Sequence, residues 1–423
     1  MRRSIMREVY IIGVGMTRFG KHLDRSEKDL VREALEKVMG DVPEVKIGDI
    51  QSAFFSNMGW GYFTGQHSIR GQVALRPLGI EGIPITNVEN ACGGGSTALH
   101  GAWKDVACGL YDCSLAVGME KLYNEDKVKS FKAFSAGVDV SNLSGQLKVM
   151  KESLNGLHLD IPVEEDGAGA GQTRSIFMDF LATAIRRHMA VHGTTQHQLA
   201  VIASKSHFHS TMNPYAQFQN PMTVDQVLQA RSVIWPLTVP MCAPIGDGSA
   251  AVIVCSKDFL KKLKSARPVK ILASVLGSGT DRKPDRDDLN VTTRLSRQAY
   301  EIAGIGPRDI NVAEVHDATA FGELHQSESL GFCEAGEGGL LAESGATTLG
   351  GKVPINPSGG LMSKGHPIGA SGLAQIFELV TQLRNEAGPR QVEKCRLALA
   401  ENGGGLVAFE EAAMNIHILE RVG

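Results

Sequence analysis

The sequence predicts an α/β protein made of two duplicated halves, and two pairs of matching segments carry this prediction. In each half, a glycine-rich turn leads from an apolar run into an amphipathic helix, at residues 90–98 and 359–372. In each half, a second glycine turn opens an apolar run that we interpret as a strand, at Gly246 and at Gly403. The matching segments lie much farther apart than the period of a solenoid, so they indicate duplicated α/β units.

Composition supports a large core and excludes several classes of partner. The chain has 423 residues, of which 43% are hydrophobic, and a formal net charge of −3. The near-neutral charge argues against nucleic acid as a partner, and no apolar run is long enough to cross a bilayer. The seven cysteines are an odd number without the spacing of a disulfide framework, which indicates a reducing cytoplasm. The lack of a Cys-x-x-Cys pair argues against a zinc site in this chain.

The first glycine-rich turn places one cysteine at the predicted start of a helix. Residues 83–88 have the pattern of a short strand, and apolar residues from Leu99 to Val106 repeat at helical spacing up to a cap at Gly109. Cys92 would then lie where free backbone N–H groups and the helix dipole lower the pKa of a thiol. A small buried cysteine without a catalytic role explains this turn, taken alone, equally well.

Between Lys121 and about Pro240 the regular pattern loosens. Residues 127–146 mix charges, serines and glycines, and residues 178–192 have helical character. We interpret the segment as an inserted lobe that lies over the active-site face. The predicted boundaries are 1–120 and 241–265 for the first half, 121–240 for the inserted loop domain, and 266–423 for the second half.

The second glycine-rich turn leads into a helix that we expect to end at Gly388. His366 lies in this turn, and His316 follows an apolar run between the two turns. A cysteine with two histidines on loops beside regular elements fits an activated nucleophile, although either histidine alone would more often be structural. The apolar positions of the helix are Leu373, Ile376, Phe377, Val380 and Leu383.

These three motifs, in this order and spacing, resemble the thiolase superfamily, and most of all its sterol-carrier-protein type with the bacterial and archaeal relatives of that type. The similarity runs from residue 9 to residue 409 and includes the turns at Cys92 and Gly365 and the His-Asp segment at His316. The resemblance implies a five-layer αβαβα core of two mixed sheets around central helices, with a loop domain over the acyl-CoA site. It also implies an obligate oligomer, a homodimer or larger.

The resemblance also implies a role for each site residue. Cys92, deprotonated by His366, would attack the substrate and carry its acyl group. Backbone N–H groups at Cys92 and near Gly403 would hold the oxyanion. His316, together with a water that Asn402 orients, would stabilise the enolate oxygen. The reaction needs no metal and no organic cofactor, because coenzyme A enters as the carrier of the substrate.

One departure from the family is specific to this sequence. Thiolases move the proton of the α-carbon with a second cysteine, either in the C-terminal glycine turn or in a His-Asp-Cys segment. Here residues 401–403 contain no cysteine, and Ala318 stands in the second place. Because a methyl group cannot transfer a proton, we expect His316, His366 or a bound water to take over this step.

The sequence therefore predicts an enzyme that makes or breaks the C–C bond of a β-oxoacyl-CoA through an acyl group on Cys92, with Ala318, Gly360 and Gly365 beside the substrate. Relatives with this pattern imply either acetoacetyl-CoA or a branched or aromatic substrate such as benzoylsuccinyl-CoA, and the missing cysteine slightly favours the second. They also imply a small zinc-ribbon and OB-fold partner protein. A retro-aldol lyase acting on a CoA ester and a non-catalytic acyl-CoA-binding subunit are the alternatives.

Overall fold

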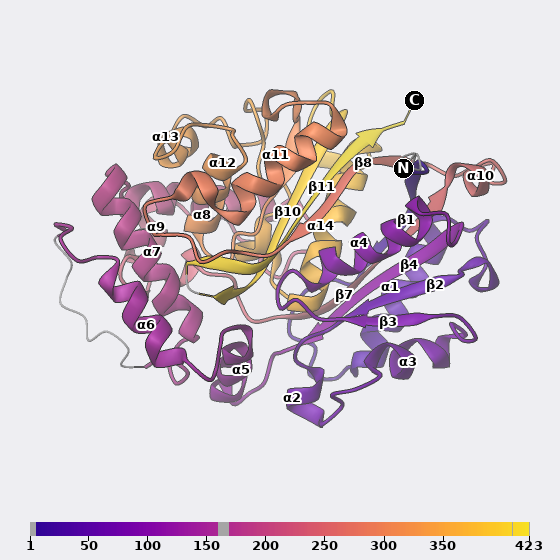
Figure 1. Ribbon diagram of the computed structural model, residues 1–423, viewed down its shortest axis with the longest axis horizontal. Helices are drawn as coiled ribbons and strands as arrows, with labels where there is room; N and C mark the ends of the chain where they lie inside the picture. The colour runs from indigo at the N-terminus through magenta and orange to yellow at the C-terminus, as the bar shows by residue number, and fades with distance from the viewer. Residues whose placement is uncertain (1–5, 160–168, 408, 423) are drawn as a thin grey trace.

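The computed structural model describes residues 6–159, 169–407 and 409–422, and most of its strands form one mixed sheet of nine (Figure 1). A separate ribbon pairs β5 (Ser232–Ile234) with β6 (Leu237–Thr238). The α/β class and the two similar halves are thus confirmed. The N-terminal half of the sheet has the order β3 (Ile85–Val88), β2 (Ser52–Ser56), β4 (Cys113–Lys121), β7 (Asp247–Ser256) and β1 (Val9–Met16). The C-terminal half continues with β8 (Val269–Gly277), β11 (Glu410–Arg421), β10 (Leu397–Val407) and β9 (Val312–Glu314).

The two halves of the sheet are joined by one short stretch of pairing. β1 pairs with β8 only over Val9–Ile11 and residues 269–271, whereas it pairs with β7 from Val9 to Met16. The two mixed sheets that the family resemblance implies are therefore hydrogen-bonded to each other at this one place. Elsewhere the two halves are separated by helices.

Successive residues of a strand face opposite sides of the sheet, and this alternation explains how the sheet and helices are layered. In β1, Val9 and Ile11 belong to a central apolar cluster, and Tyr10 and Ile12 belong to a second cluster on the opposite face. Two helices that pack against each other, α4 (Gly94–Ala107) and α14 (Ile368–Leu383), also contribute side chains to the central cluster. The outer faces are covered by α1 (Glu27–Asp41) in the first half and by α11 (Val291–Ala303) in the second. These are the five layers expected.

The two central helices approach each other closely at their first turns. A Cβ added to Gly95 of α4 would lie 2.9 Å from the carbonyl oxygen of Gly369 of α14. Strand β4 comes equally near, because a Cβ added to its Gly118 would lie 2.0 Å from the same oxygen. Only glycine allows backbones to pass at this separation. Because each helix begins just after one of the two glycine-rich turns, this contact brings Cys92 and His366 to the same place.

The described parts of the segment 121–240 are more regular than their sequence indicates, because about half of these residues form helices. They run along one side of the molecule in Figure 1 and pack on the end of β10 through Leu406. The helices of this lobe are α5 (Lys127–Phe134), α6 (Leu143–Glu152), α7 (Ile176–His192), α8 (Gln196–Ser210) and α9 (Val224–Gln229). The short helices elsewhere are α2 (Trp60–Thr64), α3 (Arg70–Leu75), α10 (Lys257–Leu260), α12 (Ala320–Ser329), α13 (Gly338–Glu343) and a π-helical turn, η7 (Gly360–Lys364).

Two expected boundaries were wrong. The helix expected to end at Gly388 ends at Leu383, because Asn385 already takes the left-handed conformation, with φ of 59°, that closes it. The glycines from Gly403 to Gly405 do not open a strand but lie near the end of β10, which begins at Leu397. Among the described residues, no helix has the length and apolar character needed to span a membrane.

Candidate active site

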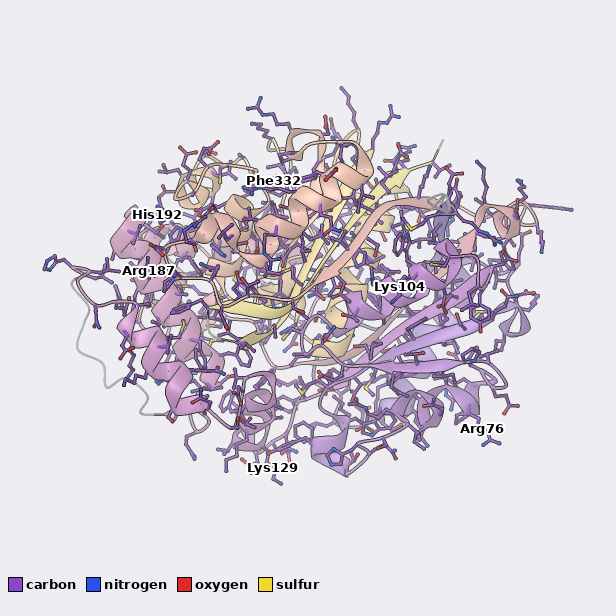
Figure 2. The ribbon with its side chains drawn as sticks, viewed as in Figure 1. Arg76, Lys104, Lys129, Arg187, His192 and Phe332 are labelled. Carbon is purple, nitrogen blue, oxygen red and sulfur yellow. The ribbon has the colours of Figure 1, made fainter. Side chains whose placement is uncertain are left out.

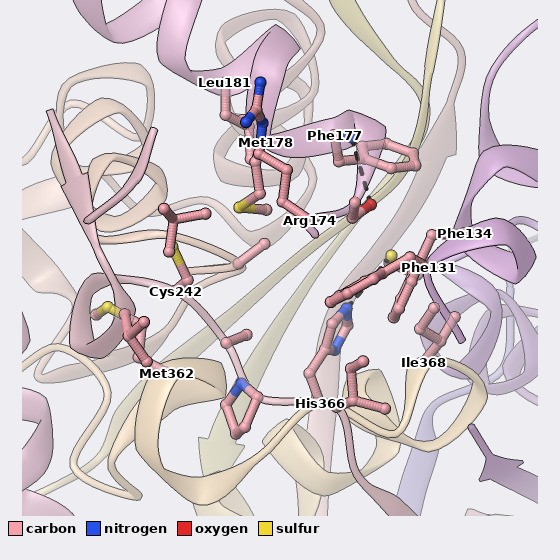
Figure 3. Close-up of a pocket in the computed structure, with 18 of the residues that line it drawn as sticks. Phe131, Phe134, Arg174, Phe177, Met178, Leu181, Cys242, Met362, His366 and Ile368 are labelled. Carbon is pink, nitrogen blue, oxygen red and sulfur yellow. Dashed lines mark hydrogen bonds between the residues drawn. The ribbon is translucent and has the colours of Figure 1, made fainter. Parts of the chain in front are cut away.

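Cys92, His316 and His366 converge at the point where the two central helices begin. The Cys92 Sγ atom lies 3.3 Å from Nε2 of His366, and one ligand-type atom from each of the three side chains lies within 4.8 Å of the others. Figure 3 shows His366 in a cavity whose walls include Phe131 and Phe134. Residues more than 270 positions apart thus form a pair with the spacing of a nucleophile and its base.

A strained turn presents the cysteine. Ala91, the residue before it, has a φ of 45°, a left-handed conformation that is uncommon for alanine. The turn is closed by the Gly93 N–H, which donates to the Asn90 carbonyl at 2.9 Å, and α4 begins at Gly94. The predicted position of Cys92 at the start of a helix is confirmed, and the strain indicates a functional turn.

The predicted lowering of the thiol pKa was wrong. Burial raises the pKa of Cys92 to about 12, and the carboxylates of Glu89 and Glu120 add to this effect. The backbone N–H groups of Cys92 and Gly405 face the sulfur and act in the opposite direction, but they do not outweigh burial. Cys92 therefore rests as a thiol, and it becomes a nucleophile only when a base removes its proton.

The hydrogen bonds of His366 fix which of its nitrogens is the base. The Ser371 hydroxyl donates its one proton to the Pro367 carbonyl at 3.0 Å, so it accepts from Nδ1 of His366 at 2.8 Å. Nε2 is then unprotonated and faces the Cys92 thiol. Burial, with smaller contributions from His316 and Lys364, holds the pKa of His366 well below its ordinary value. The imidazole is therefore a neutral acceptor for the thiol proton.

His316 presents a hydrogen-bond donor, whereas His366 presents an acceptor. The side-chain amide nitrogen of Asn402, which can only donate, lies 3.0 Å from Nδ1 of His316. The ring proton must then sit on Nε2. Burial lowers the pKa of His316 to about 4, and its backbone N–H donates to the Glu401 carboxyl at 2.8 Å. His316 is thus a neutral N–H donor, suited to hold a developing oxyanion.

These protonation states predict that the reactivity of Cys92 has no titration midpoint near neutral pH. The pKa of His366 is lowered, so its base form persists in mild acid, and the pKa of Cys92 is raised to about 12, so its thiol persists in mild base. Between about pH 6 and pH 9 neither group changes its charge. The rate of alkylation of Cys92 by iodoacetamide follows the thiolate fraction, so it is expected to rise about tenfold per pH unit over the whole range without levelling off. A sigmoidal rise with a midpoint inside the range would contradict the assignment.

A backbone N–H close to the predicted Gly403 faces the cysteine sulfur. Gly403 lines the cavity, but the N–H that faces the Cys92 sulfur belongs to Gly405, which has a φ of 66°. The β10–β11 register pairs Gly404 with Ala413 and then Leu406 with Glu411, and the left-handed Gly405 lies between. A Cβ on Gly404 would lie 2.3 Å from the backbone N of Gly93. The strand therefore passes so close to the cysteine turn that only glycine fits at this position.

Of the three expected substrate contacts, only Ala318 lines the cavity. Gly360 has a φ of 59°, and a Cβ there would lie 2.0 Å from a carboxyl oxygen of Asp317. Gly365 has a φ of 110°, and its Cβ would meet Gln217 at 3.0 Å. Both glycines are buried and serve the backbone of the turn around η7, so their predicted substrate contact is not found.

The main cavity has a volume of about 580 Å³ and its walls come from both halves and from the lobe. Apolar walls suit an acyl or pantetheine chain, and cationic side chains suit phosphate groups. The sequence reasoning missed these residues, because the lobe shows little periodicity. Its aromatic and sulfur-containing walls include Phe131, Phe134, Phe177, Met178 and Met362, and its basic residues are Lys21, Lys127, Arg174 and Arg231.

A second cavity of about 150 Å³ adjoins the first on the far side of His316 and Ala318. Phe180 and Phe321 line it, as do Arg187 and His192 of α7 (Figure 2). A cavity of about this volume holds a ring the size of benzene. The wall that the two cavities share consists of Leu181, His316, Ala318, Leu406 and Glu411.

The three central side chains are also of the kinds that bind zinc. Two hydrogen bonds oppose this use: the Cys92 thiol is paired with His366, and Nδ1 of His316 is taken by the side-chain amide of Asn402. Their arrangement therefore fits acyl transfer, with a nucleophile, a base and an N–H donor, better than it fits a metal.

Comparison with known protein families identifies this arrangement. The thiolase N-terminal domain matches residues 9–258, and the thiolase C-terminal domain-like family matches residues 279–420. The chain therefore belongs to the thiolase family, and it is an enzyme of the acyl-CoA acyltransferase class.

Within the family the chain is similar to sterol carrier protein 2 of Rattus norvegicus, with 38% identity over 96% of this chain and 73% of that protein. It is also similar to the benzoylsuccinyl-CoA thiolase subunit BbsB of Thauera aromatica, with 36% identity over 95% of this chain and 96% of that protein. These relatives confirm the predicted subfamily. The solved Ltp2–ChsH2(DUF35) aldolase shares the fold, with a TM-score of 0.77, 22% identity, and coverage of 99% of this chain and 98% of that chain.

Proposed function

We propose that the enzyme cleaves or forms the C2–C3 bond of a β-oxoacyl-CoA through an acyl group on Cys92. In cleavage, His366 takes the thiol proton while the sulfur attacks the 3-keto carbon. The backbone N–H groups of Cys92 and Gly405 hold the oxyanion, and Nε2–H of His316 holds the enolate oxygen after the bond breaks. Free CoA then removes the acyl group from the cysteine. Coenzyme A is a substrate here, and no other cofactor enters.

The observation that carries this proposal is the contact of 3.3 Å between Cys92 Sγ and the unprotonated Nε2 of His366. The test is incubation with a set of β-oxoacyl-CoA esters, each with and without free CoA. Thiolysis gives two acyl-CoA products and needs CoA. Retro-aldol cleavage proceeds without CoA, and a non-catalytic binding subunit releases no product, so either result would reject the proposal.

For the substrate, we propose a 3-oxoacyl group larger than acetoacetyl, in the branched or aromatic class to which benzoylsuccinyl-CoA belongs. Two observations support it: the ring-sized second cavity beyond Ala318, and the similarity to BbsB. Acetoacetyl-CoA is the alternative. Because a methyl group leaves the second cavity empty, filling that cavity should penalise only large substrates.

Ala184, on α7, lines the second cavity but not the first, so Ala184→Phe fills the space without touching the catalytic groups. The variant is expected to lower kcat/KM for 3-oxo-3-phenylpropanoyl-CoA by about 10-fold or more and to change kcat/KM for acetoacetyl-CoA less than about twofold. Ala190→Phe, on the same helix but lining neither cavity, is the control. An equal effect on both substrates would contradict the proposal.

We also propose that the chain works as a homodimer or larger assembly with a small partner protein of the zinc-ribbon and OB-fold type. The support is that BbsB is named as a subunit, and that the solved Ltp2 aldolase is a complex with ChsH2(DUF35). The chain produced alone is expected to have low activity that rises when the partner is co-expressed. Full activity of the purified chain without another protein would reject this part.

A further inference from the structure

The vacant positions for the second thiolase cysteine leave the α-carbon without an assigned acid or base. Ala318 has no ionisable group, and Asn402 is engaged with His316. His316 itself carries its proton on Nε2 and acts as a donor to oxygen. The base His366 is committed to Cys92. Cleavage nevertheless needs a proton on C2 of the departing enolate, and synthesis needs a base at the same carbon.

One carboxylate lies on the wall of the reaction chamber. Among the described residues that line the main cavity, Glu411 is the one carboxyl side chain, and it is part of the wall shared with His316 and Ala318. Asp317 and Glu401, which are close in sequence to site residues, line neither cavity. The Glu411 carboxyl is therefore the acidic group in this region that a substrate can reach.

The position of Glu411 is set by the β10–β11 hairpin. Glu411 is paired with Leu406 across the hairpin, and its Cγ lies 2.8 Å from the place that a Cβ on Gly403 would occupy. Its carboxyl group accepts a hydrogen bond of 3.2 Å from the side-chain amide of Gln326 on α12. A side chain larger than hydrogen at position 403 would displace Glu411, so this glycine makes room for the carboxylate beside the oxyanion strand.

We infer that Glu411 is the acid and base that acts on the α-carbon, in place of the second cysteine of other thiolases. The inference rests on the proposed function. In cleavage, the electron pair of the C2–C3 bond passes to C2, and the Glu411 carboxylic acid gives its proton to that carbon. The proton that His366 took from Cys92 then passes through solvent to the Glu411 carboxylate. Neutral His366 next takes the thiol proton of incoming CoA–SH as the CoA sulfur attacks the acyl group on Cys92. His366 returns its proton to the departing Cys92 sulfur, so atoms and charges balance.

Two separate assays, acyl transfer and α-proton exchange, distinguish the proposed role of Glu411 from the role of Cys92. Acyl transfer, measured as exchange of labelled CoA into acyl-CoA, needs Cys92 and His366 but no proton at C2. Exchange of the α-protons of acetyl-CoA, propionyl-CoA and succinyl-CoA for deuterium needs the acid and base at C2. The Glu411→Gln variant is expected to slow deuterium exchange by about 100-fold or more and to change acyl transfer less than about threefold. Glu420→Gln, near the other end of β11, is the control and is expected to match the wild type in both assays.

A rescue variant excludes a merely structural effect. In the Glu411→Gln background, Ala318→Cys places a thiol in the vacant family position, and we expect it to restore deuterium exchange at least about tenfold. Unchanged deuterium exchange in Glu411→Gln, or an equal loss of both half-reactions, would overturn the inference. So would a wild type that transfers acyl groups but exchanges no α-proton. A wild type without acyl transfer would instead reject the proposed function itself.

Discussion

Replacement of Cys92 by alanine is expected to lower kcat for cleavage of the native β-oxoacyl-CoA by at least about 10⁴-fold, because no other group can carry the acyl intermediate. The turn itself should survive, since it is held by backbone bonds such as Gly93 N–H to the Asn90 carbonyl. Steady-state thiolysis and a thermal unfolding curve measure the two effects separately. Cys108→Ser, which changes an exposed cysteine at the far end of α4, is the control. Substantial thiolysis by a folded Cys92→Ala protein would exclude an acyl-cysteine mechanism.

The His366→Gln variant is expected to lower the rate of Cys92 acylation by about 10²- to 10⁴-fold. Since burial raises the thiol pKa to about 12, very little thiolate exists near neutral pH without a base. Glutamine can donate a hydrogen bond to the sulfur, but it cannot take the proton. Stopped-flow measurement of acylation would show the loss in the first half-reaction. His197→Gln, on the exposed part of α8, is the control. A rate within about fivefold of the wild type would mean that another group deprotonates Cys92.

The positions of Cys92 and His366 at the starts of two helices could be predicted from local sequence. Each residue lies in a glycine-rich turn directly before an amphipathic helix, and the duplicated halves make those helices central partners. The glycines at positions 95 and 369, which let the helices touch, are visible in the same two motifs. Short-range pattern thus predicted where each residue lies on its element, and the family resemblance predicted that they act as a pair.

What the sequence did not predict depends on contacts between distant segments. The sign of the Cys92 pKa shift follows from burial under the lobe and beside Glu120, and neither is visible near the cysteine motif. The backbone N–H that faces the Cys92 sulfur belongs to Gly405, and the sequence of a run of three glycines does not show which of them takes that position. Glu411 lies in a hairpin with no motif of its own, so only the fold shows that it reaches the cavity.

The most direct test of the account is the intact mass of the protein during turnover. The protein is mixed with a β-oxoacyl-CoA that it cleaves, in the absence of free CoA, and is quenched in acid before mass measurement and peptide mapping. We predict a mass increase equal to the acyl group beyond C2, located on the peptide that contains Cys92 and removed when free CoA is added. Cleavage without any adduct, or an adduct on a residue other than Cys92, would contradict the account.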